Sequence, residues 1–134
     1  WGNYPGPHTH DVPLADVADI VFSARPRTVL FEGANPRHAH EWAELDAAVV
    51  PDDVVLVPGV IETNSQTVEH PALVAQRLCH WADLVGRERV MAGTDCGFST
   101  FAGLPTVWPS VVWDKLRAMA EGAARATDRL WGRA

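Results

Sequence analysis

The chain has 134 residues, which is enough for one domain with a buried core. Its composition, 47% hydrophobic and 21% charged, is that of an ordinary globular domain and excludes a disordered or collagen-like chain. The net charge of -6 and the lack of a Lys/Arg cluster argue against a nucleic-acid partner.

Two features bear on where the protein resides. No apolar run approaches the roughly 18 residues of a membrane span, so no membrane partner is expected. Cys79 and Cys96 are too few for a disulfide-stapled secreted fold, which favours a reducing cytoplasm. The opening stretch WGNYPGPHTHD is typical of a loop, and we expect it to continue from an upstream segment.

Alternating apolar runs predict helices and strands in turn. Residues 12–23 carry apolar side chains at helical spacing, so a short helix is expected there. Residues 28–31, TVLF, suit a strand buried on both faces of a parallel sheet. Residues 37–48, RHAHEWAELDAA, can form a helix. The order at this point is therefore helix, strand, helix.

The second half repeats the alternation. A helix over residues 70–85 is favoured by a proline in its first turn and a glycine after its end. The other expected elements are a strand at 54–61 interrupted at Pro58-Gly59, a strand at 89–93 and a helix at 110–131. Within the helices, Trp42, Trp81 and Trp113 are expected in the core, and His70 is expected to begin its helix.

This order predicts an α/β fold with a parallel sheet built from right-handed βα units. Two architectures compete: an open doubly wound sheet, or part of a TIM (β/α)8 barrel. Three strands cannot close a barrel, which takes about 250 residues. The barrel interpretation therefore makes residues 1–134 a C-terminal portion, because three strands alone leave sheet edges open.

Each predicted strand ends in polar or acidic residues: FEGAN, VIETNS and GTDCGF. In barrels the chemistry lies at these carboxyl ends. If the strands lie near each other, Cys96 and Glu32 face one mouth, and a thiolate with a carboxylate is a plausible pair of zinc ligands. The structural alternatives are that Cys96 is a buried small residue and that Glu32 caps a helix.

The histidines allow both metal binding and structural roles. His8 and His10 lie two residues apart in a loop, where they could chelate a metal or decorate the surface. His38 and His40 are expected to be structural or solvent-facing. The motifs GxSxG, GxxxxGK[ST], GxGxxG and CxxC are missing, which removes the commoner hydrolase, nucleotide and zinc-finger interpretations.

Three stretches, TVLFEGANPR, VLVPGVIETNSQTVEHP and RVMAGTDCGFSTF, together resemble the C-terminal catalytic barrel of cobalamin-independent methionine synthases. The chain is still more similar to shorter bacterial relatives of that family, which include epoxyalkane:coenzyme M transferases. The resemblance implies a barrel with zinc at the carboxyl ends of its strands, where a substrate thiol binds the metal and is alkylated. Coordination converts the thiol to a thiolate at neutral pH.

The resemblance also implies roles for residues. Cys96 matches the family's DCG motif and Glu32 the acid that ends an earlier strand, so both would be zinc ligands. The family has a further H-x-C element, for which two alignments are open. One sets His10 on its histidine and Val12 on its cysteine; the other places both ligands upstream of Trp1 and leaves His8 and His10 at the mouth.

Asn64 stands where methionine synthases have a histidine proton donor. Asparagine donates a hydrogen bond but gives up no proton, which argues against a methyltetrahydrofolate donor, whose leaving amine needs an acid. In epoxide opening Asn64 could stabilise the leaving oxygen only as a fixed dipole. Methyl transfer from a better leaving group would need neither a proton donor nor such a dipole. Asp95 is expected to bind the nucleophile or orient the metal ligands. Arg37 would hold an anion such as a sulfonate or form a surface salt bridge.

The expected function is a zinc-dependent thiol alkyltransferase of cobalamin-independent methionine synthase type, similar to 5-methyltetrahydropteroyltriglutamate–homocysteine S-methyltransferase. The alternatives are epoxyalkane:coenzyme M transfer and a non-catalytic α/β binding module with a decayed site. The expected partners are a small-molecule thiol, an alkyl donor, and either the missing N-terminal half of the barrel or further copies of the chain. Residues 1–134 alone are expected to be inactive.

Overall fold

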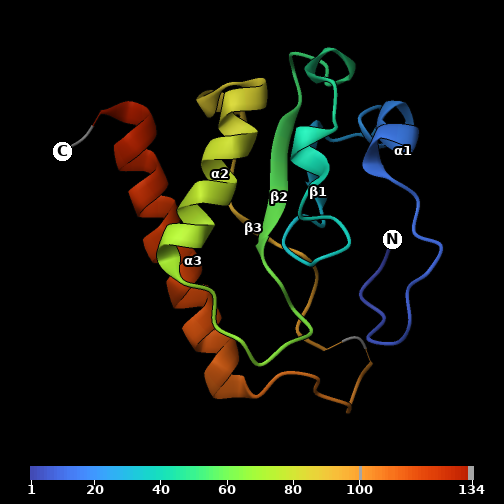
Figure 1. Cartoon of the computed structure of the whole chain (residues 1–134), viewed down its shortest axis with the longest axis vertical. Helices are drawn as coiled ribbons and strands as arrows, with labels where there is room; N and C mark the ends of the chain where they lie inside the picture. The colour runs from blue at the N-terminus through green and yellow to red at the C-terminus, as the bar shows by residue number, and fades with distance from the viewer. Residues whose placement is uncertain (100, 133–134) are drawn as a thin grey trace.

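A computed structural model describes residues 1–99 and 101–132 and contains a three-stranded parallel sheet flanked by helices (Figure 1). The strand order is β1-β2-β3, so β2 is central. The main elements are α1 (Leu14–Val21), β1 (Thr28–Phe31), β2 (Val55–Ile61), α2 (Pro71–Val85), β3 (Gly93–Thr94) and α3 (Pro109–Trp131). The predicted α/β class with parallel strands is confirmed.

The interruption expected at Pro58-Gly59 is wrong, because β2 runs through these residues as one strand. β1 pairs with β2 in regular register from Thr28 opposite Val55 to Phe31 opposite Pro58. β2 pairs with β3 only beyond this point, with a register shift between Gly59 and Ile61. The proline thus lies where β2 changes from pairing with one neighbour to pairing with the other.

The third strand is shorter than expected over residues 89–93. Only Gly93–Thr94 form β3, preceded by an isolated bridge between Val90 and Leu56. Residues Arg87–Arg89 form a 3₁₀ turn, η3, instead. This edge segment pairs on one side only, and Met91 is largely exposed, so little burial supports a longer strand.

The helix expected over residues 37–48 is also wrong. Two short 3₁₀ helices, η1 (Glu41–Ala43) and η2 (Ala47–Val49), occupy this segment. The Asp46 carboxylate accepts the Ala48 N–H and so caps a new turn, which competes with helix continuation. The Glu41 side chain points inward, where it accepts the Leu14 N–H at 2.8 Å.

Two apolar clusters hold the helices to the sheet. α1 packs against β1, and Phe31 makes edge contacts with Phe22 of the α1 exit and Trp81 of α2. The second cluster joins the end of β2 to α2 and α3. Trp81 lies in the core as expected, but Trp113 is 69% exposed. α3 turns Ala118, Gly122 and Ala126 inward, which puts Trp113 on the outer face of the helix.

Within the described residues, none of the helices combines the length and apolar character needed to cross a bilayer.

Replacing Gly122 by alanine should destabilise the fold, although alanine is the better helix former by about 1 kcal/mol in exposed positions. A Cβ at Gly122 would lie 2.4 Å from Val74 Cβ, so α2 and α3 would have to separate. We expect the free energy of unfolding in urea to fall by about 1–3 kcal/mol. The matched control is Gly97→Ala, which should change stability little because a Cβ at Gly97 would meet no atom within 4 Å. A stabilised Gly122→Ala variant would contradict this packing.

Candidate functional site

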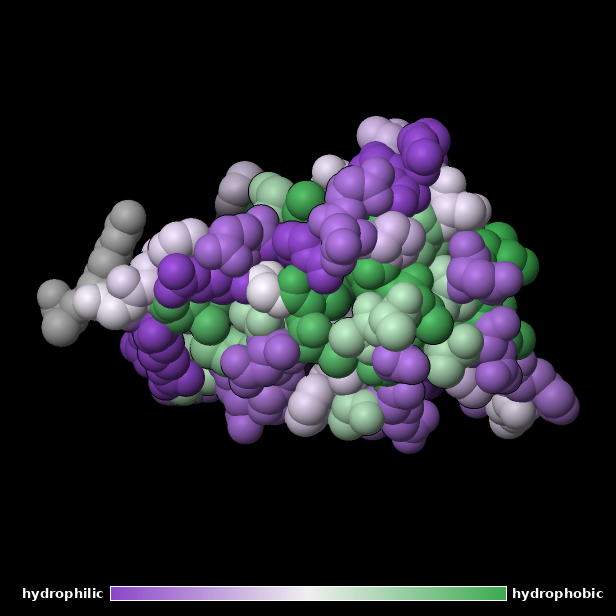
Figure 2. All heavy atoms as spheres, turned by 90° about the horizontal axis from the view of Figure 1, so that it is seen from above, coloured by the Kyte–Doolittle hydropathy of each residue, from purple (hydrophilic) through white to green (hydrophobic). Residues whose placement is uncertain are grey.

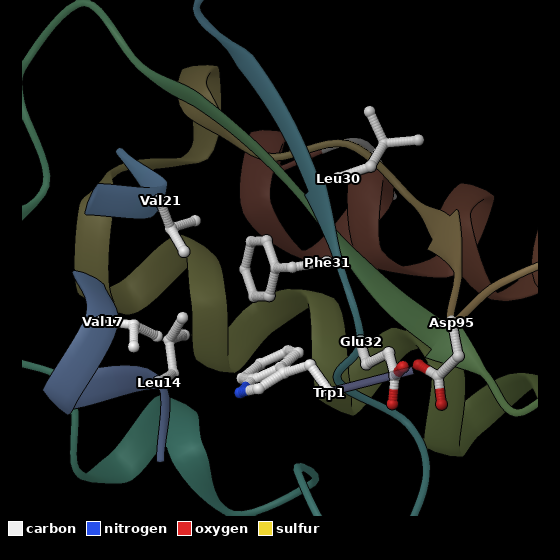
Figure 3. A pocket seen from close by; sticks show the side chains of 8 residues that line it. All are labelled: Trp1, Leu14, Val17, Val21, Leu30, Phe31, Glu32 and Asp95. Carbon is white, nitrogen blue, oxygen red and sulfur yellow. The ribbon is translucent and has the colours of Figure 1, made fainter. Parts of the chain in front are cut away.

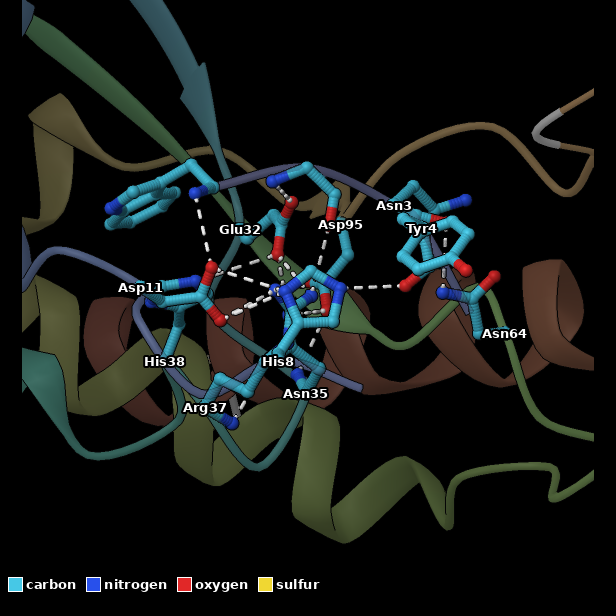
Figure 4. Close-up of polar contacts among 12 residues, drawn as sticks. Asn3, Tyr4, His8, Asp11, Glu32, Asn35, Arg37, His38, Asn64 and Asp95 are labelled. Carbon is cyan, nitrogen blue, oxygen red and sulfur yellow. Dashed lines mark hydrogen bonds and ion pairs between the residues drawn. The ribbon is translucent and has the colours of Figure 1, made fainter. Parts of the chain in front are cut away.

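An acidic residue directly follows each strand, and the parallel order brings all of them to one end of the sheet. Figure 4 shows two of them, Glu32 and Asp95, side by side. Glu32 follows β1, Glu62 follows β2 and Asp95 follows β3. Glu32 and Asp95 are buried, at 6% and 9% exposure. Because β2 lies between β1 and β3, Glu32 and Cys96 extend from next-but-one strands and not from adjacent ones.

The side-chain amide of Asn35 joins the two buried carboxylates. Its Nδ2 donates to Glu32 Oε2 at 2.8 Å and to Asp95 Oδ2 at 2.9 Å. A primary amide has two N–H donors, so one asparagine can satisfy both acceptors. Asn35 therefore fixes the distance between the ends of β1 and β3.

Asp95 ties the loop after β1 to the end of β3. Its Oδ1 accepts the N–H groups of Gly33 and Ala34, and its Oδ2 accepts the N–H of Asn35, each at 2.8 Å. The carboxylate reaches this loop across Gly59, where a Cβ would lie 1.9 Å from Oδ1. Burial raises the pKa of Asp95, and the N–H donors oppose that rise.

These contacts occupy both Asp95 oxygens. They support a role in orienting the side chains of the site, which is one of the two roles predicted for this residue, over direct binding of a nucleophile.

The Glu32 carboxylate has partners on both oxygens. Oε1 accepts the Gly2 N–H at 2.9 Å, and Oε2 pairs with Arg37 Nη2 at 2.9 Å in addition to Asn35. Glu32 does not cap a helix, since η1 begins only at Glu41. The contact with Gly2 places the first residues of the chain across the carboxyl end of β1.

His38 is deeply buried, at 2% exposure, and is stacked on Trp1 with ring centroids 3.8 Å apart. Its Nδ1 lies 3.2 Å from Glu41 Oε2 and its Nε2 lies 3.7 Å from Glu32 Oε2. Neither ring nitrogen has a hydrogen-bond partner within the described part of the chain. His38 and His40 were expected to be structural or solvent-facing. His38 is structural, and His40 is exposed to solvent.

Arg37 lies in a network of ion pairs. Its guanidinium contacts Asp11 Oδ2 at 3.1 Å and Glu32 Oε2 at 2.9 Å, and also donates to the Gly2 carbonyl. These contacts support a salt bridge over the binding of a substrate anion. His8 joins the network: its Nε2 lies 2.7 Å from the Tyr4 carbonyl, and its Nδ1 lies 3.0 Å from Asp11 Oδ2.

The structure does not gather the three predicted metal ligands into one group. Cys96 is exposed, and its carbonyl accepts the Thr94 hydroxyl at 2.8 Å. His10 is exposed, with Nδ1 2.8 Å from Thr9 Oγ1. Over residues 1–99 and 101–132, no set of three or more His, Cys, Asp and Glu side chains is arranged to hold a metal ion. These residues by themselves therefore do not fit a complete zinc site.

Two hollows flank the carboxylates. A polar cleft of about 370 Å³ is lined by residues that include Tyr4, His8, Arg37, Glu62 and Asn64. In it, Asn64 Nδ2 donates to the Asn3 carbonyl, while its Oδ1 is buried without a partner among the described residues. A second cavity, of about 400 Å³ and mainly apolar, lies between α1 and β1 beneath Trp1 (Figure 3).

Asn35, Asp11 and Glu62 also belong to the site but were not predicted from the sequence. Asn35 and Glu62 had a usable signal, since both lie within four residues of a predicted strand end, where polar side chains converge. Asp11 had none, because its neighbours come from a loop and from residues 26 positions away.

Asp95→Asn should destabilise the fold, because the amide has only one acceptor oxygen for N–H groups that now occupy two. Each buried backbone N–H left without an acceptor costs about 1–3 kcal/mol, measured by urea unfolding. The control Asp52→Asn alters a fully exposed carboxylate and should change stability little. Equal stability of the two variants would show that Asp95 does not hold the loop.

Asp11 should titrate at unusually low pH. The hydrogen bond from His8 holds the pKa of Asp11 well below its ordinary range. The hydrogen bond and the charge of Arg37 act in the same direction, whereas burial opposes them. The contribution of Asp11 to stability is therefore present above the unfolded-state pKa and is lost as pH falls through the folded-state pKa. NMR titration should show the Asp11 pKa rising in Arg37→Gln. Arg25→Gln, which removes an exposed arginine, should leave it unchanged.

No protein-family model matches the sequence, and no curated protein is significantly similar to it. Among solved structures, the fold is similar to that of a B12-independent methionine synthase from Shewanella sp. W3-18-1 in complex with selenomethionine, with a TM-score of 0.63 and 18% sequence identity. The match covers 87% of this chain and 31% of that chain, so this chain spans less than a third of that protein's length. At this identity the likeness is one of fold: a parallel α/β arrangement shared with part of a methionine synthase.

Proposed function

We propose that residues 1–134 are the C-terminal portion of a TIM-barrel domain of methionine-synthase type, which transfers an alkyl group to a small-molecule thiol. The observation that carries the proposal is the pair of buried carboxylates, Glu32 and Asp95, joined by Asn35 at the carboxyl ends of parallel strands. This is the end of a barrel sheet where catalytic groups lie. The fold likeness over 87% of the chain adds to it.

The exposed surfaces along β1 support a larger barrel. Among residues 1–99 and 101–132, β1 pairs only with β2, so its other edge offers unpaired backbone groups. Leu30, which lines the apolar cavity of about 400 Å³, is 68% exposed on this strand, and Ile20 is 70% exposed on α1. Figure 2 shows apolar side chains reaching the surface between polar ones. Further βα units would cover these side chains; a second copy of the chain is the alternative partner.

Zinc is the proposed cofactor, with Glu32 and Cys96 as the ligands that this chain contributes. The remaining ligands would come from an H-x-C element before Trp1, or in part from His10. The Gly2 N–H on Glu32 Oε1 supports the first choice, because the backbone enters the site beside that carboxylate. Bound zinc would supply a site at which a substrate thiol is held as its thiolate.

The chain's own residues would then orient the metal ligand and bind the electrophile. Asn35 and Asp95 would hold the Glu32 carboxylate in one orientation, while Asn64 and His8 would line the cleft for the electrophile. An epoxyalkane:coenzyme M transferase is less well supported, because the Arg37 guanidinium is committed to Asp11 and Glu32. A non-catalytic α/β module has one observation in its favour: the Glu32 carboxylate is already fully hydrogen-bonded.

Zinc content tests the proposal on the protein expressed from its complete gene. We expect one zinc per chain by elemental analysis, and a loss of metal affinity of at least about tenfold in Cys96→Ser and in Glu32→Gln. Cys79→Ser is the matched control, since Cys79 lies within α2 and does not follow a strand, and it should retain zinc. Substoichiometric zinc in the parent protein, or equal zinc in all variants, would favour the non-catalytic module.

A further inference from the structure

Glu62 carries a carboxylate that the network around Glu32 leaves out. It follows the last residue of the central strand β2 and lines the polar cleft with Tyr4 and Asn64. Its Oε1 accepts the Asn64 N–H at 2.8 Å. Its Oε2 has no hydrogen-bond or ion-pair partner among residues 1–99 and 101–132. One carboxylate oxygen is therefore available to a molecule in the cleft.

The positive charges nearby are committed elsewhere. Arg37, which also lines the cleft, pairs with Asp11 and Glu32. Arg77 lies behind the strand ends and donates to the carbonyls of Val60 and Ala34. Burial lowers the pKa of Arg77, and the negative charges of Glu69, Asp95 and Glu62 oppose that fall, although Arg77 forms no direct ion pair with Glu62 among the described residues. The side of the cleft that Glu62 lines therefore carries a negative charge that no direct ion pair neutralises.

Glu62 is held in place from behind by a buried ion pair. Its backbone N–H donates to Glu69 Oε1 at 2.8 Å, and Glu69 Oε2 accepts from Lys115 Nζ at 2.9 Å. Lys115, on α3, is fully buried, and Glu69 is 9% exposed. A buried pair of this kind fixes geometry, because breaking it would leave an uncompensated charge. The carboxylate is therefore presented to the cleft from a rigid support.

An aromatic ring borders the same cleft. Tyr4 is 55% exposed, and Figure 4 shows its ring next to Asn64. The chain turns tightly beneath this ring: a Cβ on Gly6 would lie 2.2 Å from Tyr4 Cε1. Gly6 thereby lets the ring lie close against the backbone that follows it. An aromatic face and an unpaired carboxylate together are the features that bind organic cations.

We propose that this cleft binds the methylated onium group, quaternary ammonium or sulfonium, of the alkyl donor. The assignment rests on the proposed function and names its donor class. A substrate thiolate would attack the methyl carbon of the onium group. A new S–C bond forms, the C–N or C–S bond of the donor breaks, and its electron pair stays on the departing atom, which leaves as a neutral amine or thioether.

No proton is needed in this transfer, because the leaving group departs uncharged. That removes the difficulty posed by Asn64, which can donate a hydrogen bond but cannot act as an acid. The unpaired Glu62 carboxylate would stabilise the cation in the bound donor.

Three ligands of similar size test the assignment by NMR titration of the protein expressed from its complete gene. Choline carries the onium group, 3,3-dimethylbutan-1-ol is its neutral carbon isostere, and 2-aminoethanol carries a primary ammonium. Choline should bind most tightly and shift the amide resonances of Glu62 and Asn64. Choline binding no tighter than that of the isostere, or weaker than that of 2-aminoethanol, would overturn the assignment.

Variants locate the site. Glu62→Gln should weaken choline binding about tenfold while leaving binding of the neutral isostere unchanged. Tyr4→Leu should weaken it severalfold, and Tyr4→Phe should retain it because the ring face is kept. Glu121→Gln, on the exposed face of α3, is the matched control and should bind as the parent does. Unchanged choline affinity in Glu62→Gln would overturn the proposal.

The two proposals fail separately. Zinc that depends on Cys96, without choline binding, would overturn only the cation site. Choline binding that depends on Glu62, in a protein without zinc, would overturn the zinc-dependent alkyl transfer and keep the cation site.

Discussion

The site depends on one amide shared by two buried carboxylates. Asn35 donates to both Glu32 and Asp95, whose strands are separated by β2 and do not pair with each other. Without these donors, two negative side chains in a water-poor region would repel each other and lose their hydration. The loop after β1, the absence of a side chain at Gly59 and the position of Asp95 all serve this single arrangement.

The N-terminal segment completes the same region from the other side. Trp1 covers His38, the Gly2 amide bonds Glu32, and the Asn3 side chain reaches the Gly97 carbonyl. Three consecutive residues thus span the strand ends from β1 to the loop after β3. This segment lacks regular secondary structure, so its conformation depends on these long-range contacts.

Much of the fold was predictable because short-range signals decide it. The strand at residues 28–31 and the helix that starts at Pro71 and ends before Gly86 follow from apolar runs and helix-boundary residues. Residues 37–48 were misassigned because Asp46 and Glu41 form contacts that a helical pattern does not reveal. In the site, the acidic residues at the strand ends were visible in the sequence, but the ion pairs of Arg37 and the burial of His38 arise from tertiary packing.

The fully buried Lys115 has a practical consequence, since it is the only lysine among 11 basic Lys and Arg residues. Its ammonium is sealed between α3 and Glu69, so acylating reagents aimed at side-chain amines cannot reach it while the helix stays docked. Modification of this one side-chain nitrogen would therefore report that α3 has separated from the rest of the fold, and it would do so without any added label.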